Sequence, residues 1–157
     1  EMTALCHSYG TALIINDNVE VALKSGADGV HVGIEDTPVK EIRKMVPGDF
    51  IIGATAKTTE QAQRAEQEGA DYIGVGAVFP SPTKKNAIRI TLEQLKKISG
   101  SVRIPAVAIG GITYENADTL RGGGMAGMAV VSAVFGAADI KKETARLKKK
   151  IQETVCL

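Results

Sequence analysis

Acidic and amide side chains stand where two neighbouring apolar runs of the sequence end. Asn16 and Asp17 close the first run. Glu35 and Asp36 follow the second. Their oxygens suit a hard divalent cation, because magnesium takes one or two carboxylates and leaves its other positions to water and substrate phosphates. Spacing alone favours the simpler alternative that Asp17 and Asp36 cap the helices after them.

A second candidate is the loop of residues 79–85, which follows the fourth apolar run and reads FPSPTKK. Two prolines stiffen it, Ser81 and Thr83 supply hydroxyls, and Lys84 and Lys85 supply positive charge. Such a loop can reach over an adjacent site and bind a polyphosphate. The alternative is an exposed turn with solvated lysines, which the composition does not exclude.

The last two apolar runs end in residues suited to an anion. The fifth run ends at Gly110 and Gly111, and the sixth ends at Val131 and Ser132, before a predicted helical turn near Gly136. Glycines let a backbone N–H group approach an anion closely, and the serine adds a hydroxyl. These positions predict a phosphate site. The alternative is that the glycines serve only tight turns.

Six apolar runs alternate with polar or amphipathic stretches along the chain. Their near-continuous hydrophobicity favours parallel strands buried on both faces. They span residues 12–16, 29–33, 50–55, 72–78, 105–110 and 128–133. The stretches between them predict helices, one of which begins after Thr58 and stops at Gly69. These helices span residues 58–68, 92–98, 114–120 and 139–155, and two more follow Asp17 and Asp36.

A weak internal repeat supports this alternation. Gly26-Ala27-Asp28 precedes the second run and Gly69-Ala70-Asp71 precedes the fourth, while Gly124 holds the same place before the last. Each glycine is predicted to end a helix and lead into a strand. Repeated strand–helix units indicate a doubly wound sheet or a barrel. No GxGxxG motif with a partner acid follows the first run, so the α/β fold predicted is a TIM (β/α)₈ barrel.

The composition is that of an ordinary globular protein, and we expect a single domain over residues 1–157. Hydrophobic residues make up 44%, charged residues 24% and aromatics 4%, and the formal net charge is +1. These values favour neither nucleic acid nor a membrane surface as a partner. No apolar run reaches membrane-spanning length. We expect a cytoplasmic enzyme acting on small molecules, with a homo-oligomer left open.

The two histidines offer no catalytic dyad. His31 lies inside the second run, where a histidine packed within the barrel is expected in preference to a catalytic base. His7 belongs to the tail of an opening helix and is expected at the surface. No Ser-His-Asp or Cys-His nucleophile set can be assembled from the sequence.

Taken in order, these motifs resemble the thiamine-phosphate synthases. The resemblance runs from about Leu5 to the last helix, and five motifs in the same order are far more specific than any one of them. They are Ile14-Ile15-Asn16-Asp17, Gly29-Val30-His31-Val32-Gly33 with Glu35-Asp36, Gly74-Val75-Gly76 through Lys85, Ala108-Ile109-Gly110-Gly111-Ile112 with Asn116, and Ala129-Val130-Val131-Ser132-Ala133.

The resemblance implies an activity and a set of site residues. An aminopyrimidine-methyl diphosphate is joined to a thiazole phosphate, which gives thiamine phosphate and pyrophosphate by a dissociative, magnesium-dependent reaction. The implied magnesium ligands are Asp17 and Asp36. The implied contacts to the diphosphate are Asn16, Thr55 and Lys84, those to the thiazole phosphate are Gly111, Val131 and Ser132, and Ser81 and Thr83 complete the substrate site.

The start of the barrel has no counterpart in the sequence. In the family, the second strand carries a Gln-x-Arg-x-Lys set for the pyrimidine diphosphate, and nothing here corresponds to it. At roughly 30 residues per unit, about 50 residues for the first two strands and the helix between them are expected to be absent. We therefore expect the sequence to be a piece of a longer polypeptide, with six of the eight units.

Three alternatives to the synthase remain open. A thiazole tautomerase would act on a similar thiazole phosphate, but it has no diphosphate for Asp17, Asp36 and the 79–85 loop to bind. Another phosphate-binding barrel would keep the glycine and serine site without needing the paired aspartates. A non-catalytic phosphate-binding fragment would bind its ligand without magnesium and without turnover.

Overall fold

The protein is built on one curled parallel sheet. The computed structural model describes residues 1–80 and 89–155. Its six strands are hydrogen-bonded in sequence order, and all five pairs of neighbours are parallel. The strands are β1 (Ile14–Asn16), β2 (Gly29–Val32), β3 (Ile51–Ala56), β4 (Tyr72–Gly76), β5 (Ala106–Ile109) and β6 (Gly127–Ala129). The predicted parallel α/β architecture is thus confirmed.

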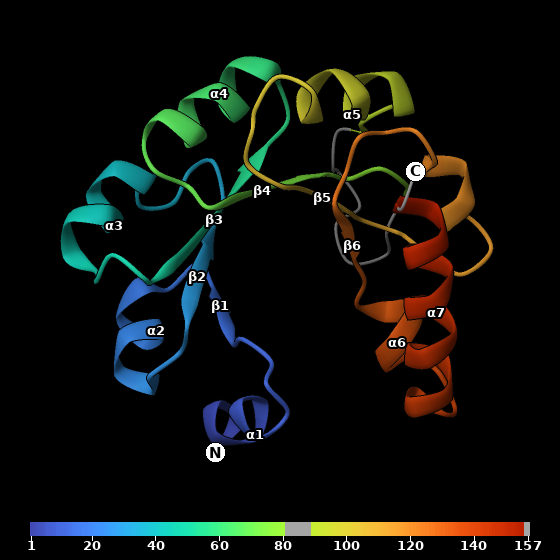
Figure 1. Cartoon of the computed structure of the whole chain (residues 1–157), viewed down its shortest axis with the longest axis horizontal. Coiled ribbons are helices and arrows are strands. Elements are labelled where there is room, and N and C mark those ends of the chain that lie inside the picture. The colour runs from blue at the N-terminus through green and yellow to red at the C-terminus, as the bar shows by residue number, and fades with distance from the viewer. Residues whose placement is uncertain (81–88, 156–157) are drawn as a thin grey trace.

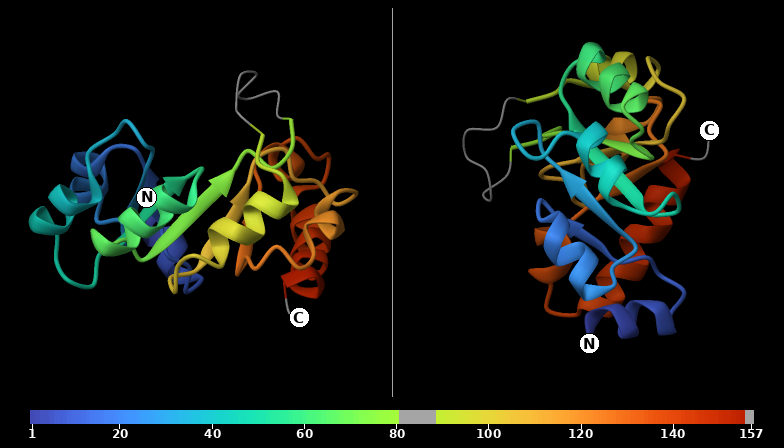
Figure 2. Two further views of the ribbon diagram at one scale, coloured as in Figure 1. Left: turned by 90° about the horizontal axis from the view of Figure 1, so that it is seen from above. Right: turned by 90° about the vertical axis from the view of Figure 1, so that its left-hand side faces the viewer.

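Helices cover the outer, convex face of this sheet, and the strands line the inner, concave face (Figure 1). The connections that follow β1 to β4 each include an α-helix of the outer layer. The helices are α1 (Met2–Ser8), α2 (Val19–Ser25), α3 (Val39–Met45), α4 (Thr59–Gln67), α5 (Leu92–Ser99), α6 (Ser132–Phe135) and α7 (Ile140–Val155), with a 3₁₀ turn η1 at Ala117–Leu120. Two further views show the same layers from the side (Figure 2).

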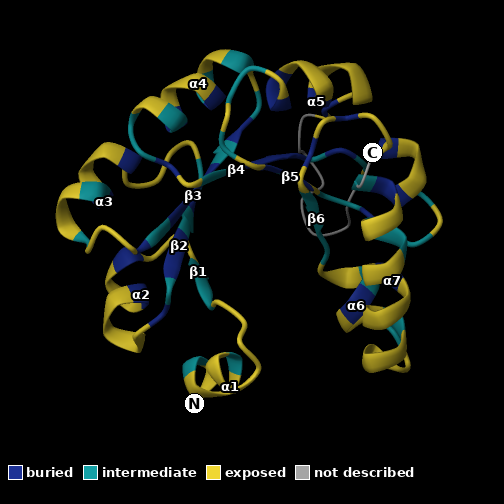
Figure 3. Cartoon of the chain, viewed as in Figure 1, coloured by how far each residue is buried: buried dark blue, intermediate teal, exposed yellow. Residues whose placement is uncertain are grey.

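The core lies between the sheet and the helices, because strand side chains alternate between the two faces. Figure 3 shows this buried layer as dark segments along the strands and the inner sides of the helices. The convex positions of the central strands are buried: Val30, Val32, Ile52, Ala54, Ile73, Val75, Ala106 and Ala108. The alternate positions face the concave side, and His31, Thr55 and Tyr72 among them are only partly buried.

The sheet is a curled half-barrel rather than a closed ring. β1 and β6 are its end strands, and within the described ranges each pairs with a strand on one side only. In Figure 1 the side between α1 and α6 is open. The observed fold is therefore that of a partial TIM-like barrel.

Most predicted helix boundaries are confirmed by their caps. The Thr58 side chain accepts a hydrogen bond from the Gln61 amide at 3.2 Å and starts α4. Gly26 ends α2 in the left-handed conformation, with φ of 66°, where glycine avoids the clash that a Cβ would make.

Two predicted elements were too long by three residues or more. The helix predicted over 114–120 is only the 3₁₀ turn of η1, and the strand predicted over 128–133 ends at Ala129. The second error has a simple cause, because an apolar run continues past the point where the chain turns into α6 at Ser132. Gly124, third in the repeat, follows η1 only after an intervening turn and does not end an α-helix.

The Gly-Ala-Asp repeat has a structural role. The Asp28 carboxylate accepts a hydrogen bond from the Leu13 amide at 2.7 Å, just before β1. The Asp71 carboxylate accepts one from the Ile52 amide at 2.7 Å, in β3. In each case the aspartate that leads into one strand binds the backbone of the preceding strand in sequence. The repeat thus couples neighbouring strands at the edge opposite the candidate site.

We expect Asp71→Ala to lower the free energy of unfolding by about 1 to 3 kcal/mol, because the Ile52 amide loses its acceptor. The Arg43 guanidinium, which donates to the same carboxylate at 2.6 Å, also loses a partner. Urea unfolding followed by circular dichroism measures the change. Asp49→Ala, which removes an exposed aspartate from the preceding turn, is the matched control, and an equal loss in both variants would contradict this role for Asp71.

None of the helices within residues 1–80 and 89–155 combines the length and apolarity that a membrane-spanning helix requires.

Candidate functional site

Asp17 follows β1 at the carboxyl edge of the sheet and is not a helix cap. The residue that caps α2 is Asn18, whose side chain accepts a hydrogen bond from the Val21 amide at 2.9 Å. The Asp17 amide donates to the His31 carbonyl at 2.7 Å. Its φ of 66° makes it the one non-glycine residue of the described ranges with positive φ. A backbone held in this sparsely populated region is typical of functional sites.

Asp36 follows β2 at the same edge, and it does not cap a helix either. The residue before α3 is Pro38, which makes no side-chain cap. The Oδ2 atom of Asp36 instead accepts a hydrogen bond from the Gly33 amide at 2.7 Å, which folds the loop back onto the end of β2. The alternative that Asp17 and Asp36 are helix caps is therefore wrong for both residues.

These two carboxylates fit a magnesium ion as a donor set. They are hard oxygen ligands that follow adjacent parallel strands, and magnesium commonly takes only one or two carboxylates from a protein. Both lie near enough to His31 to influence its ionisation. Outside residues 81–88 and 156–157, no group of three or more His, Cys, Asp or Glu side chains is arranged to hold a metal. A complete all-protein cage is thus absent from the described part, and substrate and water would have to supply the remaining ligands of a bound ion.

A polar chain crosses the concave face next to the carboxylates. The His31 Nε2 atom lies 3.1 Å from the Thr55 hydroxyl oxygen, and His31 Nδ1 lies 3.0 Å from the Tyr72 hydroxyl oxygen. Asn16 is the register partner of His31 at the end of β1. The structure thus brings Asn16, Thr55 and the two aspartates to one side of the sheet's carboxyl edge.

Burial changes the pKa values of His31 and Tyr72 in this row of hydrogen-bonded side chains. It lowers the pKa of the His31 imidazole below its ordinary value, and the opposing charges of Asp17 and Asp36 offset this effect only in part. Burial also raises the pKa of the Tyr72 hydroxyl. Burial therefore favours the neutral form of both groups.

The glycines after β5 are the second group of candidate site residues. Gly110 has φ of 104° and Gly111 has φ of 64°, a region that side chains disfavour. A Cβ on Gly111 would lie 2.3 Å from the Pro80 carbonyl oxygen, and one on Gly110 would lie 2.6 Å from the Ala77 Cβ. Only glycine fits at either position. The backbone here is packed tightly against the segment that follows β4, and both segments lie at the carboxyl edge.

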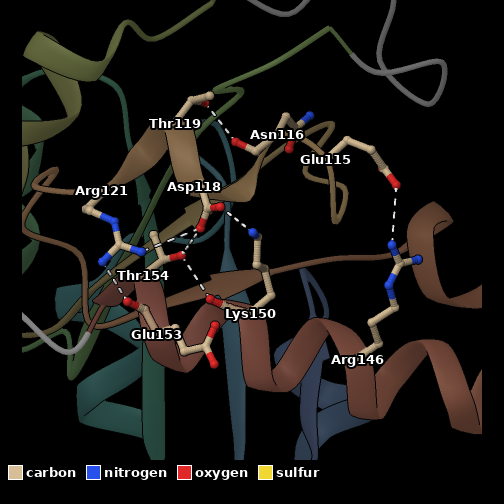
Figure 4. Close-up of polar contacts among 9 residues, drawn as sticks. All are labelled: Glu115, Asn116, Asp118, Thr119, Arg121, Arg146, Lys150, Glu153 and Thr154. Carbon is tan, nitrogen blue, oxygen red and sulfur yellow. Dashed lines mark hydrogen bonds and ion pairs between the residues drawn. The ribbon is translucent and has the colours of Figure 1, made fainter.

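The loop after Gly111 is braced by Asn116. Its Nδ2 atom donates to the Gly111 carbonyl at 2.9 Å, and its Oδ1 atom accepts from the Thr113 amide at 2.8 Å. The chain then enters η1, which α7 holds in place (Figure 4). The Asp118 carboxylate pairs with Lys150 and accepts a hydrogen bond from the buried Thr154 hydroxyl at 3.0 Å. The glycine loop is therefore anchored from both ends.

A cation–π contact adds to this anchor. The Arg146 guanidinium of α7 lies 3.5 Å from the centre of the Tyr114 ring and 4.0 Å from the Glu115 carboxylate. Figure 4 shows Arg146 and Lys150 reaching from the same helix toward this loop. Lys150 of α7 therefore takes part in the anchor together with Arg146.

Val131 and Ser132 lie where β6 turns into α6. Val131 is the residue before the helix, and Ser132 is its first residue. Because β5 and β6 are adjacent parallel strands, the segments that follow them emerge at the same edge. Gly111, Val131 and Ser132 therefore lie on segments that leave the sheet at the same edge. The predicted helical turn is confirmed, with Gly136 as its C-cap.

Three predicted site residues, Ser81, Thr83 and Lys84, lie outside the described residues. The flanks of this segment are described. The Phe79 amide donates to the Gly110 carbonyl at 3.0 Å, and the Ile90 amide donates to the Ala77 carbonyl at 2.8 Å. Both flanks therefore lie at the carboxyl edge, next to the glycine loop.

Two residues with evident roles were missed from the sequence. In the sequence, Tyr72 marks only the start of a predicted strand. Its pairing with Gly53 on the neighbouring strand can be seen only when the register between the two strands is known. Asn116 was noted only as part of a motif. Its side chain bonds an amide three residues earlier, a local side-chain-to-backbone contact that asparagine commonly makes.

Comparison with known proteins identifies the family. The sequence profile described as thiamine monophosphate synthase matches residues 1–134. A thiamine-phosphate synthase of Caldivirga maquilingensis is 45% identical over 139 residues, which is 88% of this chain and 67% of that protein. One from Pyrococcus abyssi is 44% identical over 155 residues, which is 99% of this chain and 74% of that protein.

A solved structure agrees with these relatives. The thiamine phosphate pyrophosphorylase of Pyrococcus furiosus superposes with a TM-score of 0.90 at 44% identity, covering 98% of this chain and 74% of that one. Likeness of this extent in both sequence and structure goes well beyond a shared barrel fold. The chain belongs to the thiamine monophosphate synthase family.

Proposed function

We propose that this chain catalyses the thiamine-phosphate synthase reaction at the carboxyl edge of its sheet. The C–O bond of the pyrimidine-methyl diphosphate breaks, and its electron pair leaves with pyrophosphate. The thiazole nitrogen of the second substrate then donates its lone pair to the methylene cation, which forms the new C–N bond. No strong base is needed, so the residues have to bind charge and align two substrates.

The diphosphate subsite is assigned to the β1–β3 side of the edge. Asp17 and Asp36 would hold magnesium, and Asn16 and Thr55 would donate hydrogen bonds to the diphosphate. When bound, magnesium would neutralise negative charge that develops on the departing pyrophosphate. Lys84 would supply a further positive charge.

The thiazole phosphate is assigned to the β5–β6 side. Gly111, Val131 and Ser132 would contact its phosphate, and Ser81 and Thr83 would complete the substrate site. Two glycines without room for a Cβ support this assignment, because a bare backbone can approach an anion closely. Asn116 would keep that backbone in place through its hydrogen bond to Gly111.

The observation that carries the proposal is that neither Asp17 nor Asp36 caps a helix. Asn18 caps α2 and no side chain caps α3. Each carboxylate therefore keeps at least one oxygen for a cation at the edge where barrel enzymes place their chemistry. A thiazole tautomerase binds no diphosphate substrate and would therefore not need this pair of carboxylates.

The test is formation of thiamine phosphate from the two substrates with and without magnesium, read as the oxidised fluorescent product. We expect product that depends on magnesium. Product that is independent of magnesium would contradict the assigned ligands. Conversion of the thiazole phosphate alone would instead favour the tautomerase, and binding without turnover would favour a non-catalytic protein.

We also propose that the half-barrel is the larger part of an eight-stranded barrel. This proposal is supported by the end strands, which pair on one side only in the described ranges, and by exposed apolar residues on both flanks. Tyr9, which follows α1, is 80% exposed, and Phe135 of α6 is 73% exposed. Open strand edges are normally covered or paired in folded proteins.

Fusing the part of the Pyrococcus furiosus protein that this chain does not cover tests the barrel proposal. We expect a higher melting temperature and stronger amide exchange protection in β1 and β6 than in the chain alone. The thiamine phosphate assay on the fusion separates the barrel proposal from the proposed activity. Activity in the fusion but not in the chain alone would show that the activity requires the completed barrel. Unchanged protection in both end strands would contradict the eight-stranded barrel.

A further inference from the structure

The hydrogen-bonded chain of Tyr72, His31 and Thr55 is built into the sheet itself. His31, Gly53 and Tyr72 are register partners in a row across β2, β3 and β4. Because Gly53 has no side chain, Tyr72 can lean across β3 and reach His31. A Cβ on Gly53 would lie 2.1 Å from the Tyr72 Cζ atom. The contact therefore depends on a glycine in the middle of a strand, where glycine is otherwise unfavourable.

A second glycine makes room for the imidazole. Gly74 is the register partner of Thr55 on β4, and a Cβ there would lie 2.9 Å from the His31 Cε1 atom. The imidazole thus lies between Tyr72 on one side and Thr55 on the other. Two strand glycines in adjacent rows serve one side-chain arrangement, of which the mechanism above uses Thr55 but neither His31 nor Tyr72.

The direction of the hydrogen bonds follows from the donors available. A neutral imidazole has one N–H group and one lone pair. In the described part of the chain, the one acceptor that the Tyr72 hydroxyl reaches is His31 Nδ1. If the phenol donates its proton there, the imidazole hydrogen must be on Nε2, and Nε2–H donates to the Thr55 hydroxyl oxygen. The opposite direction would leave the phenol proton without that partner.

We infer that His31 is a positioning residue, held by Tyr72 in the Nε2–H tautomer so that the Thr55 hydroxyl accepts from it and donates its own proton to a bound diphosphate. A hydroxyl that already accepts from a neighbour is free to turn its hydrogen toward an anion. The opposite tautomer would direct that hydrogen back to His31. The last step rests on the proposed function, whereas the direction of the two inner hydrogen bonds does not.

The first test is the tautomer, read in the chain as it stands by two-bond ¹H–¹⁵N correlation spectra of the imidazole rings. The protein has two histidines, and the His31→Gln spectrum assigns the signals. We expect a protonated Nε2 and an unprotonated Nδ1 for His31. A protonated Nδ1, alone or together with Nε2, would overturn the inference.

Tyr72→Phe is the matched variant, because it keeps the ring over Gly53 and removes only the hydroxyl. We expect the His31 signals to move toward a mixture of the two tautomers. Unchanged signals would show that Tyr72 does not select the tautomer, which contradicts that step.

The second test is binding of inorganic pyrophosphate in the presence of magnesium, measured by calorimetry. Glutamine can place an N–H group near the position of Nε2, whereas leucine cannot. We expect His31→Gln to bind within about threefold of the unaltered chain and His31→Leu to bind about tenfold more weakly. Circular dichroism confirms that each variant is folded.

The outcomes separate this inference from the proposed function. Equal binding by the unaltered chain and both variants would overturn the positioning role while leaving the diphosphate subsite intact. If pyrophosphate does not bind to the unaltered chain, the diphosphate subsite is contradicted and the last step of the inference falls with it. The hydrogen-bond direction is then decided by the spectra alone.

Discussion

Replacing Asp17 by asparagine, or Asp36 by asparagine, is expected to lower the rate of thiamine phosphate formation by about 10²- to 10³-fold at a magnesium concentration that just saturates the unaltered chain. Each variant removes one negative charge from the pair that follows β1 and β2. The backbone contact of Asp17 to His31 is retained, and the asparagine oxygen at position 36 can still accept from the Gly33 amide. The loss should therefore come from cation binding, with a higher magnesium requirement as its signature.

Neighbouring residues provide the controls. Asn18→Ala removes the cap of α2 and is expected to lower the free energy of unfolding by about 1 kcal/mol, with no change in the magnesium requirement. Glu35→Gln removes a carboxylate next to Asp36 and should keep near-normal turnover. Magnesium titrations of initial rate distinguish these cases. An unaltered magnesium requirement in both aspartate variants would remove them from the metal site.

Gly111→Ala is expected to raise KM for the thiazole phosphate by about 10- to 100-fold, because hydrogen bonds to a charged group are worth about 1.5 to 3 kcal/mol. The new Cβ would lie 2.3 Å from the Pro80 carbonyl oxygen and 2.9 Å from the Phe79 Cβ. The loop must move away from both, which also lowers the free energy of unfolding by about 2 to 4 kcal/mol. Steady-state kinetics with each substrate varied in turn, together with urea unfolding, measures the two effects.

Gly122→Ala is the matched control for this variant. Gly122 has φ of 79°, and a Cβ there would meet nothing within 4 Å. It therefore carries the backbone cost of about 1 to 2 kcal/mol without the crowding, and KM should be unchanged. If Gly111→Ala raised KM for both substrates equally, the assignment of this loop to the thiazole phosphate would be wrong.

Much of the fold could be predicted because it depends on local patterns. Apolar runs of strand length recur along the chain, and parallel strands covered by helices require such runs. Thr58 begins α4 and Gly26 ends α2 for reasons of backbone chemistry that neighbouring residues decide. The same local logic failed at residues 128–133, because hydrophobicity continues through the turn into α6 and does not mark where β6 ends.

The candidate site residues could also be predicted from the sequence, because carboxylates and glycines at strand ends are suited to binding cations and anions. What spacing could not decide was whether Asp17 and Asp36 cap helices. That depends on which of two adjacent side chains faces the first turn, and at α2 the answer is Asn18. The family resemblance supplied the roles of these residues, and the structure removed the competing explanation.

The sequence by itself determined the order of strands and helices, because each element is specified by residues within a few positions of one another. Only the tertiary structure decided how Tyr72, His31 and Thr55 meet, since their contacts cross β2, β3 and β4 and depend on the register between them. The structural role of Gly53 and Gly74 also becomes clear only from the tertiary structure. In the sequence each is an interruption of a strand, and in the sheet each is the space that a neighbouring side chain fills.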